Sequence, residues 1–69
     1  MADSVYNVIE LVGTSTESWE QAARVAVERA TQSLRDLRVA EVVEQDLIVE
    51  NGKLQAFRTK LRLSFKNES

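Results

Sequence analysis

The chain has 69 residues, no cysteine, no histidine and a formal net charge of −2. These values exclude disulfides, thiolate and imidazole metal sites and the commonest general base, and they argue against a general nucleic-acid binder, which is normally basic. We expect a single domain over residues 1–69, too small to be comfortably stable without partner subunits.

The chain also shows none of the usual membrane or export signals. No apolar run approaches the roughly 20 residues that span a membrane, and the beginning of the chain lacks the basic and apolar segments of a signal peptide. We therefore expect a cytoplasmic protein whose partners include neither a membrane nor nucleic acid.

The first predicted elements are a strand and a helix. Residues 5–12 (VYNVIELV) are rich in β-branched and aromatic residues and predict a strand that ends at Gly13. Thr14 and Glu17 have the spacing of a capping box, and Ser15 or Thr16 is an alternative cap. A helix is predicted over residues 17–36, where Trp19 is the single large anchor of an apolar stripe. The stripe comprises Trp19, Ala23, Ala26, Val27, Ala30 and Leu34.

Two further strands are predicted over residues 38–49 and 54–66. Asn51-Gly52 between them is the strongest short signal for a hairpin with a type I′ turn. The element order β-α-β-β predicts an α+β fold, with one helix on a three-stranded antiparallel sheet and the third strand in the middle.

The hairpin predicts which residues share a face of the sheet. Pairing Glu50 with Lys53 and counting outward places apolar pairs on the helix side and the pair Glu41–Arg62 on the other side. One helix covers one face, so we expect the second face to meet other subunits or a ligand; a solvated sheet face is the alternative. The predicted helix-side pairs are Ala40–Leu63 and Val42–Leu61; the predicted exposed residues are Val39, Val43, Leu47, Arg58, Lys60, Arg62 and Ser64.

The whole chain resembles the dodecin family. The resemblance lies in VIELVGTS (residues 8–15), the Arg29-Ala30 pair, AEVV (residues 40–43) and LSF (residues 63–65). It implies that the sheet wraps the helix and that twelve copies form a hollow shell. It also implies binding, storage or buffering of a flavin, riboflavin or FMN, between subunits and without catalysis.

The resemblance assigns site residues one by one. The flavin-stacking tryptophan of the family corresponds to Val39, its flavin-bonding glutamine to Arg58, and its phosphate-binding arginines to Asp46 and Lys66. The hairpin register predicts Val39 and Arg58 on one exposed face, two positions apart on the diagonal. The candidate ligand-binding residues are thus Val39, Gln45, Arg58 and Lys66, and losing the aromatic is expected to weaken flavin binding.

A second reading starts from oxygen ligands. Glu44, Gln45 and Asp46 form an oxygen-rich cluster near Glu41, and such oxygens suit calcium. Consecutive strand residues cannot all reach one ion without a bulge or neighbouring subunits. The candidate metal ligands are Glu41, Glu44 and Asp46, and the alternative function is a shell that binds calcium. An enzyme is not expected, since no nucleophile–base or paired-carboxylate constellation is recognisable.

Overall fold

The computed structural model describes residues 3–67, in which three strands and one helix follow the predicted order. The elements are β1 (Tyr6–Ser15), α1 (Trp19–Thr31), β2 (Leu37–Glu50) and β3 (Lys53–Lys66). The strands form an antiparallel sheet in the order β1-β3-β2. The α+β fold and the central place of the third strand are therefore confirmed.

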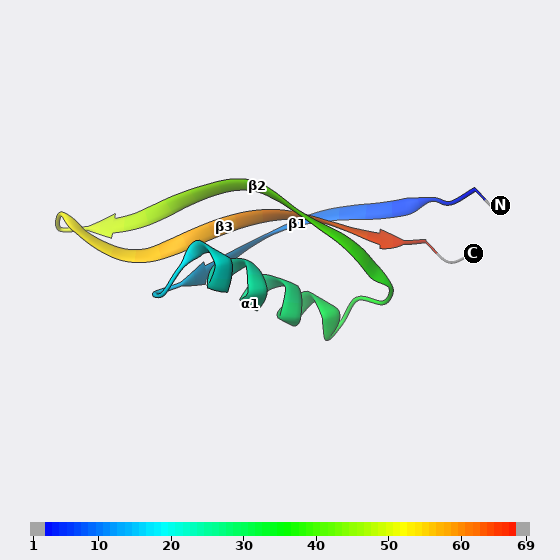
Figure 1. Ribbon diagram of the computed structural model, residues 1–69, viewed down its shortest axis with the longest axis horizontal. Coiled ribbons are helices and arrows are strands. Elements are labelled where there is room, and N and C mark those ends of the chain that lie inside the picture. Colours follow the sequence, from blue (N-terminus) through cyan, green and yellow to red (C-terminus); the bar gives the residue numbers. More distant parts are fainter. Residues whose placement is uncertain (1–2, 68–69) are drawn as a thin grey trace.

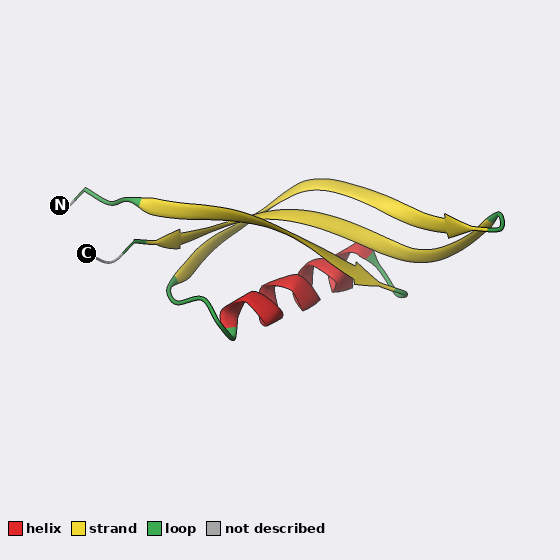
Figure 2. Cartoon of the chain, turned by 180° about the vertical axis from the view of Figure 1, so that it is seen from behind, coloured by secondary structure: helices red, strands yellow, loops and turns green. Residues whose placement is uncertain are grey.

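The helix lies on one side of a long, twisted sheet. The described chain measures 53 × 20 × 14 Å, and the β2–β3 hairpin extends well past the beginning of α1 (Figure 1). The view from behind shows that α1 covers the sheet from one side only (Figure 2). The fold thus leaves one sheet face without a covering layer.

The helix begins later than predicted because Ser18, rather than one of the three predicted residues, caps it. The Ser18 hydroxyl accepts a hydrogen bond from the backbone N–H of Gln21 at 3.0 Å. Ser15 Oγ instead accepts from the N–H of Glu17 at 2.9 Å, in the loop before the helix. The predicted capping box at Thr14 is wrong, since β1 continues through Ser15.

The helix also ends well before the predicted residue 36. α1 stops at Thr31, and the N–H groups of the next three residues bond back to carbonyl groups of its last turn. Asp36 then adopts the left-handed conformation with φ of 62°, and its carbonyl accepts a hydrogen bond from the N–H of Lys66 at 3.0 Å. The chain therefore uses residues 32–36 to turn from the helix into β2.

The core is small and lies between α1 and β3. Ala26 and Ala30 of the helix pack with Leu61 and Leu63 of the central strand, and all four are buried. Ala22, which the predicted stripe omitted, is also buried. The rest of the stripe lies at the margin of the core, where Ala23, Val27 and Leu34 are partly buried.

Gly13 allows the helix to approach the sheet closely. It lies within β1 opposite Thr59, so the prediction that it ends the strand is wrong. A Cβ atom at this position would lie 2.1 Å from the carbonyl oxygen of Ala22 and 3.0 Å from the Cβ of Ala26. The absence of a side chain is what lets the two backbones meet here.

The hairpin turn and the pairing far from it agree with prediction. Asn51 and Gly52 have φ of 53° and 73°, and two positive values define a type I′ turn. The predicted pairs Ala40–Leu63, Glu41–Arg62 and Val42–Leu61 are all present.

Two compensating bulges change the pairing between these regions. Val42 lies opposite Leu61 and Glu44 opposite Lys60, so Val43 is an extra residue in β2. Gln55 is the extra residue in β3, because Ile48 faces Ala56 while Val49 faces Leu54. Between the bulges, each residue of β2 pairs one position away from the partner that counting from the turn predicts.

The shift reverses the predicted side of Leu47. It lies opposite Phe57, whose neighbour in β1 is Ser15, on the side of the sheet that carries α1. The prediction that Leu47 belongs to the uncovered face is therefore wrong.

Candidate functional site

The uncovered sheet face carries a network of alternating charges. As predicted, the side chains of β3 on this face are mostly basic. The acidic partners come from both neighbouring strands. We call the set Glu10, Glu41, Glu44, Asp46, Arg58, Lys60 and Arg62 the charge ladder.

Arg62 joins all three strands at the middle of the charge ladder. Its Nη2 lies 3.2 Å from Oε2 of Glu10 and its Nη1 lies 3.4 Å from Oε1 of Glu41. Lys60 Nζ is 3.6 Å from the other oxygen of Glu10. The predicted Glu41–Arg62 pair is confirmed, whereas Glu10 was missed, because alternation along residues 6–12 assigns a face but not the register of β1 against β3. These exposed pairs each contribute little to stability.

Asp46 and Arg58 make the tightest contact on this face. Arg58 donates from Nε to Oδ1 of Asp46 at 2.7 Å and from Nη2 to Oδ2 at 2.6 Å. These hydrogen bonds, with the attraction of the opposite charge, lower the pKa of Asp46 and outweigh its partial loss of hydration. The same pair raises the pKa of Arg58. The pair thus favours the ionised form of Asp46.

The three candidate metal ligands lie on the same face because of the bulge at Val43. Glu41 lies opposite Arg62, Glu44 opposite Lys60 and Asp46 opposite Arg58. Gln45 lies opposite the buried Thr59, on the helix side, so it does not join them. Within residues 3–67 no three carboxylates come close enough together to hold a metal ion. One chain therefore supplies candidate ligands but not a complete metal site.

A small hollow lies beside two of these carboxylates. It has a volume of about 140 Å³, and its walls include both acidic and basic members of the charge ladder. Its lining residues are Val12, Glu44, Asp46, Arg58 and Lys60.

The candidate ligand-binding residues lie far apart within one chain. Val39 lies opposite Ser64 and is 53% exposed, whereas Arg58 lies six residues further along β3. The two share the uncovered face, but the predicted diagonal proximity is wrong, since six strand residues span about 20 Å. Val8 lies on the other side of Ser64, so two exposed valines flank one serine.

Lys66 belongs to a different part of the face. It lies opposite the half-exposed Tyr6 at the end of β1. It also borders a polar hollow of about 540 Å³, where residues 3–5 and 66–67 approach Asp36 and Arg38. Three of the four predicted ligand-binding residues thus lie at separate places on the uncovered face, and the fourth, Gln45, lies on the helix side.

Trp19 is an anchor of the fold, as predicted. Its ring meets Phe57 edge to face, with centroids 5.2 Å apart and planes at 78°. Its indole Nε1 donates to the backbone oxygen of Asp46 at 3.0 Å, and its own carbonyl accepts from Thr59 Oγ1 at 2.8 Å. This connection between the helix and the charge ladder was missed, because no local pattern relates residues so distant in sequence.

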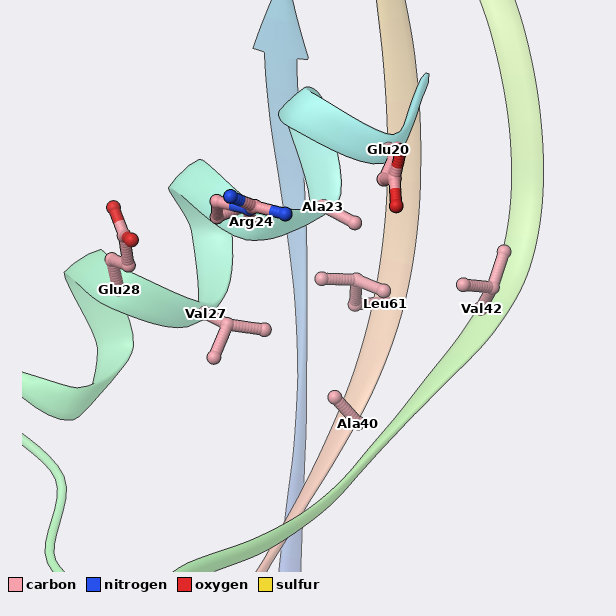
Figure 3. Close-up of a pocket in the computed structure, with 8 residues that line it drawn as sticks. All are labelled: Glu20, Ala23, Arg24, Val27, Glu28, Ala40, Val42 and Leu61. Carbon is pink, nitrogen blue, oxygen red and sulfur yellow. The ribbon is translucent and has the colours of Figure 1, made fainter. Parts of the chain in front are cut away.

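An open groove separates α1 from β2 on the helix side. Figure 3 shows Leu61, Ala40 and Val42 on the strand side of the groove and Val27 projecting towards them from the helix, which also carries Arg24 and the two glutamates. The groove has a volume of about 550 Å³. Its lining residues are Glu20, Ala23, Arg24, Val27, Glu28, Ala40, Val42 and Leu61.

Comparison with known proteins identifies the family. Residues 5–68 match the Dodecin family model, and the chain belongs to the dodecin family. The calcium dodecin of Mycobacterium tuberculosis is 54% identical over 63 residues, covering 91% of this chain and 89% of that protein. The dodecin of Thermus thermophilus is 36% identical over 64 residues, covering 93% of both.

Solved structures agree with this assignment. The dodecin of Streptomyces coelicolor has a TM-score of 0.92 and 39% identity, covering 100% of this chain and 99% of that one. The M. tuberculosis calcium dodecin, described as calcium-chelating with a novel calcium-binding site, has a TM-score of 0.83 and 55% identity, covering 94% and 93%. Separately, no helix within residues 3–67 is long and apolar enough to cross a membrane.

Proposed function

We propose that this protein is a non-catalytic, calcium-binding member of its family that acts as an assembly of identical subunits in the cytoplasm. The observation that carries the proposal is the alignment of Glu41, Glu44 and Asp46 on the uncovered side of β2. Carboxylate oxygens are the ligands that calcium prefers. The name of the 54%-identical relative from M. tuberculosis supports the same ion.

We propose an assembly because one chain alone does not bring enough oxygen ligands together to bind calcium. Calcium takes six to eight oxygen ligands, and the three carboxylates are spread along a strand that rises about 3.3 Å per residue. Copies of the chain around a symmetry axis would bring equivalent carboxylates together. The uncovered face and the small core also favour burial against other subunits. We propose the hollow homododecamer of the family as this assembly.

Flavin binding, storage or buffering is the second candidate function. The exposed row of Val8, Ser64 and Val39, with Tyr6 nearby, offers an apolar platform for a planar ligand. Val39 supplies no ring for stacking, which is worth about 1–3 kcal/mol per base where it has been measured. Arg58, the other expected flavin contact, is held by Asp46. We therefore propose calcium, ahead of riboflavin or FMN, as the ligand of this protein.

Calorimetry with calcium tests the proposal directly. The purified assembly, stripped with a chelator and checked by native mass spectrometry, is titrated with CaCl₂ and, separately, with riboflavin. We expect calcium to bind and Glu44→Gln to weaken it, because that variant removes a charged ligand with little change in shape.

Glu20→Gln on the helix is the matched control and should bind calcium as the unchanged protein does. Absence of calcium binding at millimolar concentration, or equal binding by Glu44→Gln, would contradict the proposal. Tight riboflavin binding in the same experiment would favour the second candidate.

A further inference from the structure

Asp46 is held differently from the other two candidate calcium ligands. Both of its carboxylate oxygens accept hydrogen bonds from Arg58, at 2.6 and 2.7 Å. Glu41 instead receives one longer contact from Arg62, at 3.4 Å. A planar guanidinium that faces a carboxylate in this way occupies one lone pair of each oxygen and places a positive charge beside both.

We propose that Arg58 is a built-in competitor of calcium at Asp46 and sets the affinity of the site; this inference rests on the proposed function. The positive charge of Arg58 opposes a cation at the same oxygen atoms, and its two hydrogen bonds occupy part of the lone pairs of Asp46. Calcium therefore binds more favourably when the Arg58 side chain is displaced. The energy needed to open the pair is subtracted from the binding energy.

The backbone at Asp46 is fixed, so Arg58 is the partner that moves. The carbonyl oxygen of Asp46 accepts the hydrogen bond from Trp19 Nε1 at 3.0 Å, which ties this part of β2 to the helix. Arg58 has a long, flexible stem and a side chain that is 44% exposed. It can swing into solvent without disturbing the strand.

The surroundings provide room for the exchange. The hollow bordered by Glu44, Asp46, Arg58 and Lys60 has a volume of about 140 Å³. One water needs about 10–15 Å³ on the same measure, so the hollow has room for an ion with part of its hydration shell. Glu44 borders the same hollow and also attracts Arg58.

The test compares calcium affinity in variants of the full, assembled protein. Arg58→Gln removes the charge and keeps a polar, although shorter, side chain. We expect it to bind calcium roughly three- to tenfold more tightly than the unchanged protein, given what exposed ion pairs contribute. Arg58→Lys keeps the charge but loses the paired hydrogen bonds. Its calcium affinity should lie between those of the unchanged protein and Arg58→Gln.

Arg24→Gln is the control for simple loss of positive charge, because Arg24 lies on the exposed helix surface. It should change calcium affinity less than twofold. Native mass spectrometry and circular dichroism verify that every variant assembles and folds.

The possible outcomes separate this inference from the proposed function. Calcium binding by the unchanged protein, with no gain in Arg58→Gln or an equal gain in Arg24→Gln, would overturn the competition alone. Binding by neither the unchanged protein nor Arg58→Gln would overturn both. Binding by Arg58→Gln only would support the competition and contradict the proposed function.

Discussion

Trp19 and Asp46, 27 residues apart in sequence, are joined by a hydrogen bond from the indole Nε1 to the backbone carbonyl oxygen at 3.0 Å. The bond connects the first residue of α1 with the strand that carries the candidate calcium ligands. On the opposite side of the same strand, the Asp46 carboxylate meets Arg58. A single residue of β2 thus links the helix to the charge ladder.

The Trp19→Phe variant tests how much this hydrogen bond contributes to the free energy of unfolding. The substitution keeps an aromatic ring against Phe57 but removes the indole donor, leaving a partly buried carbonyl without its partner. We expect a loss of about 1–2 kcal/mol in the free energy of unfolding. Urea denaturation at a fixed subunit concentration measures it. Tyr6→Phe, on the exposed face, is the control, and its free energy of unfolding should stay within about 0.5 kcal/mol of that of the unchanged protein. Equal losses in the two variants would contradict the role assigned to the Trp19–Asp46 hydrogen bond.

Gly13→Ala tests the close approach of α1 to β1. The new methyl group would meet the Ala22 carbonyl oxygen at 2.1 Å, so the helix must move away from the sheet. We expect destabilisation of about 1–3 kcal/mol, the usual cost of overpacking. Thermal unfolding compares it with Thr14→Ala, the next residue on the exposed side. A Gly13→Ala protein as stable as that control would mean that the helix is free to shift.

Val39→Trp tests the second candidate function. A tryptophan on this exposed position would restore a ring for stacking, and riboflavin binding should become roughly 10- to 100-fold stronger. Quenching of riboflavin fluorescence during a titration measures the change. Val49→Trp places the same ring on an exposed position of the same strand near the turn and should give no such gain. Unchanged affinity in Val39→Trp would show that residue 39 does not line a flavin site.

We expect the loss of stability in the Asp46→Asn variant to depend on pH when it is measured in calcium-free buffer. Arg58 lowers the pKa of Asp46 below its ordinary value of 3.8, so the folded protein favours the ionised carboxylate. The resulting stabilisation is complete well above that value and is lost as pH falls through the lowered pKa. The stability difference between the unchanged protein and Asp46→Asn should therefore be largest near neutral pH and shrink below about pH 4.

Arg58→Gln removes the other half of the same pair and should reproduce this pH profile. Differential scanning calorimetry from pH 7 downwards measures both variants. A stability difference that persists unchanged at the lowest pH would show that the loss comes from packing rather than from ionisation.

The sequence predicts the architecture because its strongest signals are periodic or local. Alternation over residues 54–66 identifies both faces of the central strand, and Asn51-Gly52 determines the turn. The ends of the helix were harder to place. Several hydroxyl residues precede α1, and the sequence pattern alone does not separate them. The cap is identified by the hydrogen bond from the Gln21 N–H to the Ser18 hydroxyl, which only the structure shows.

The candidate site was less predictable because it depends on pairing far from the turn. Glu41 and Arg62 were matched correctly, but a bulge adds a residue without any mark in composition, so Leu47 was assigned to the wrong face. The contact between Asp46 and Arg58 lies within the shifted segment and was missed for the same reason. The groove between α1 and β2 depends on the angle of the helix, which hydrophobic periodicity does not define.

The paired bulges at Val43 and Gln55 also imply a competing register that the hairpin does not adopt. An uninterrupted ladder from the same turn would pair Glu44 with Thr59 and turn the Asp46 carboxylate towards the helix side. Both acidic side chains would then lose their basic partners on β3, because a shift by one residue moves a side chain to the opposite face. The acidic residues therefore favour the bulged register over the uninterrupted one, and their replacement by neutral residues would reduce that preference.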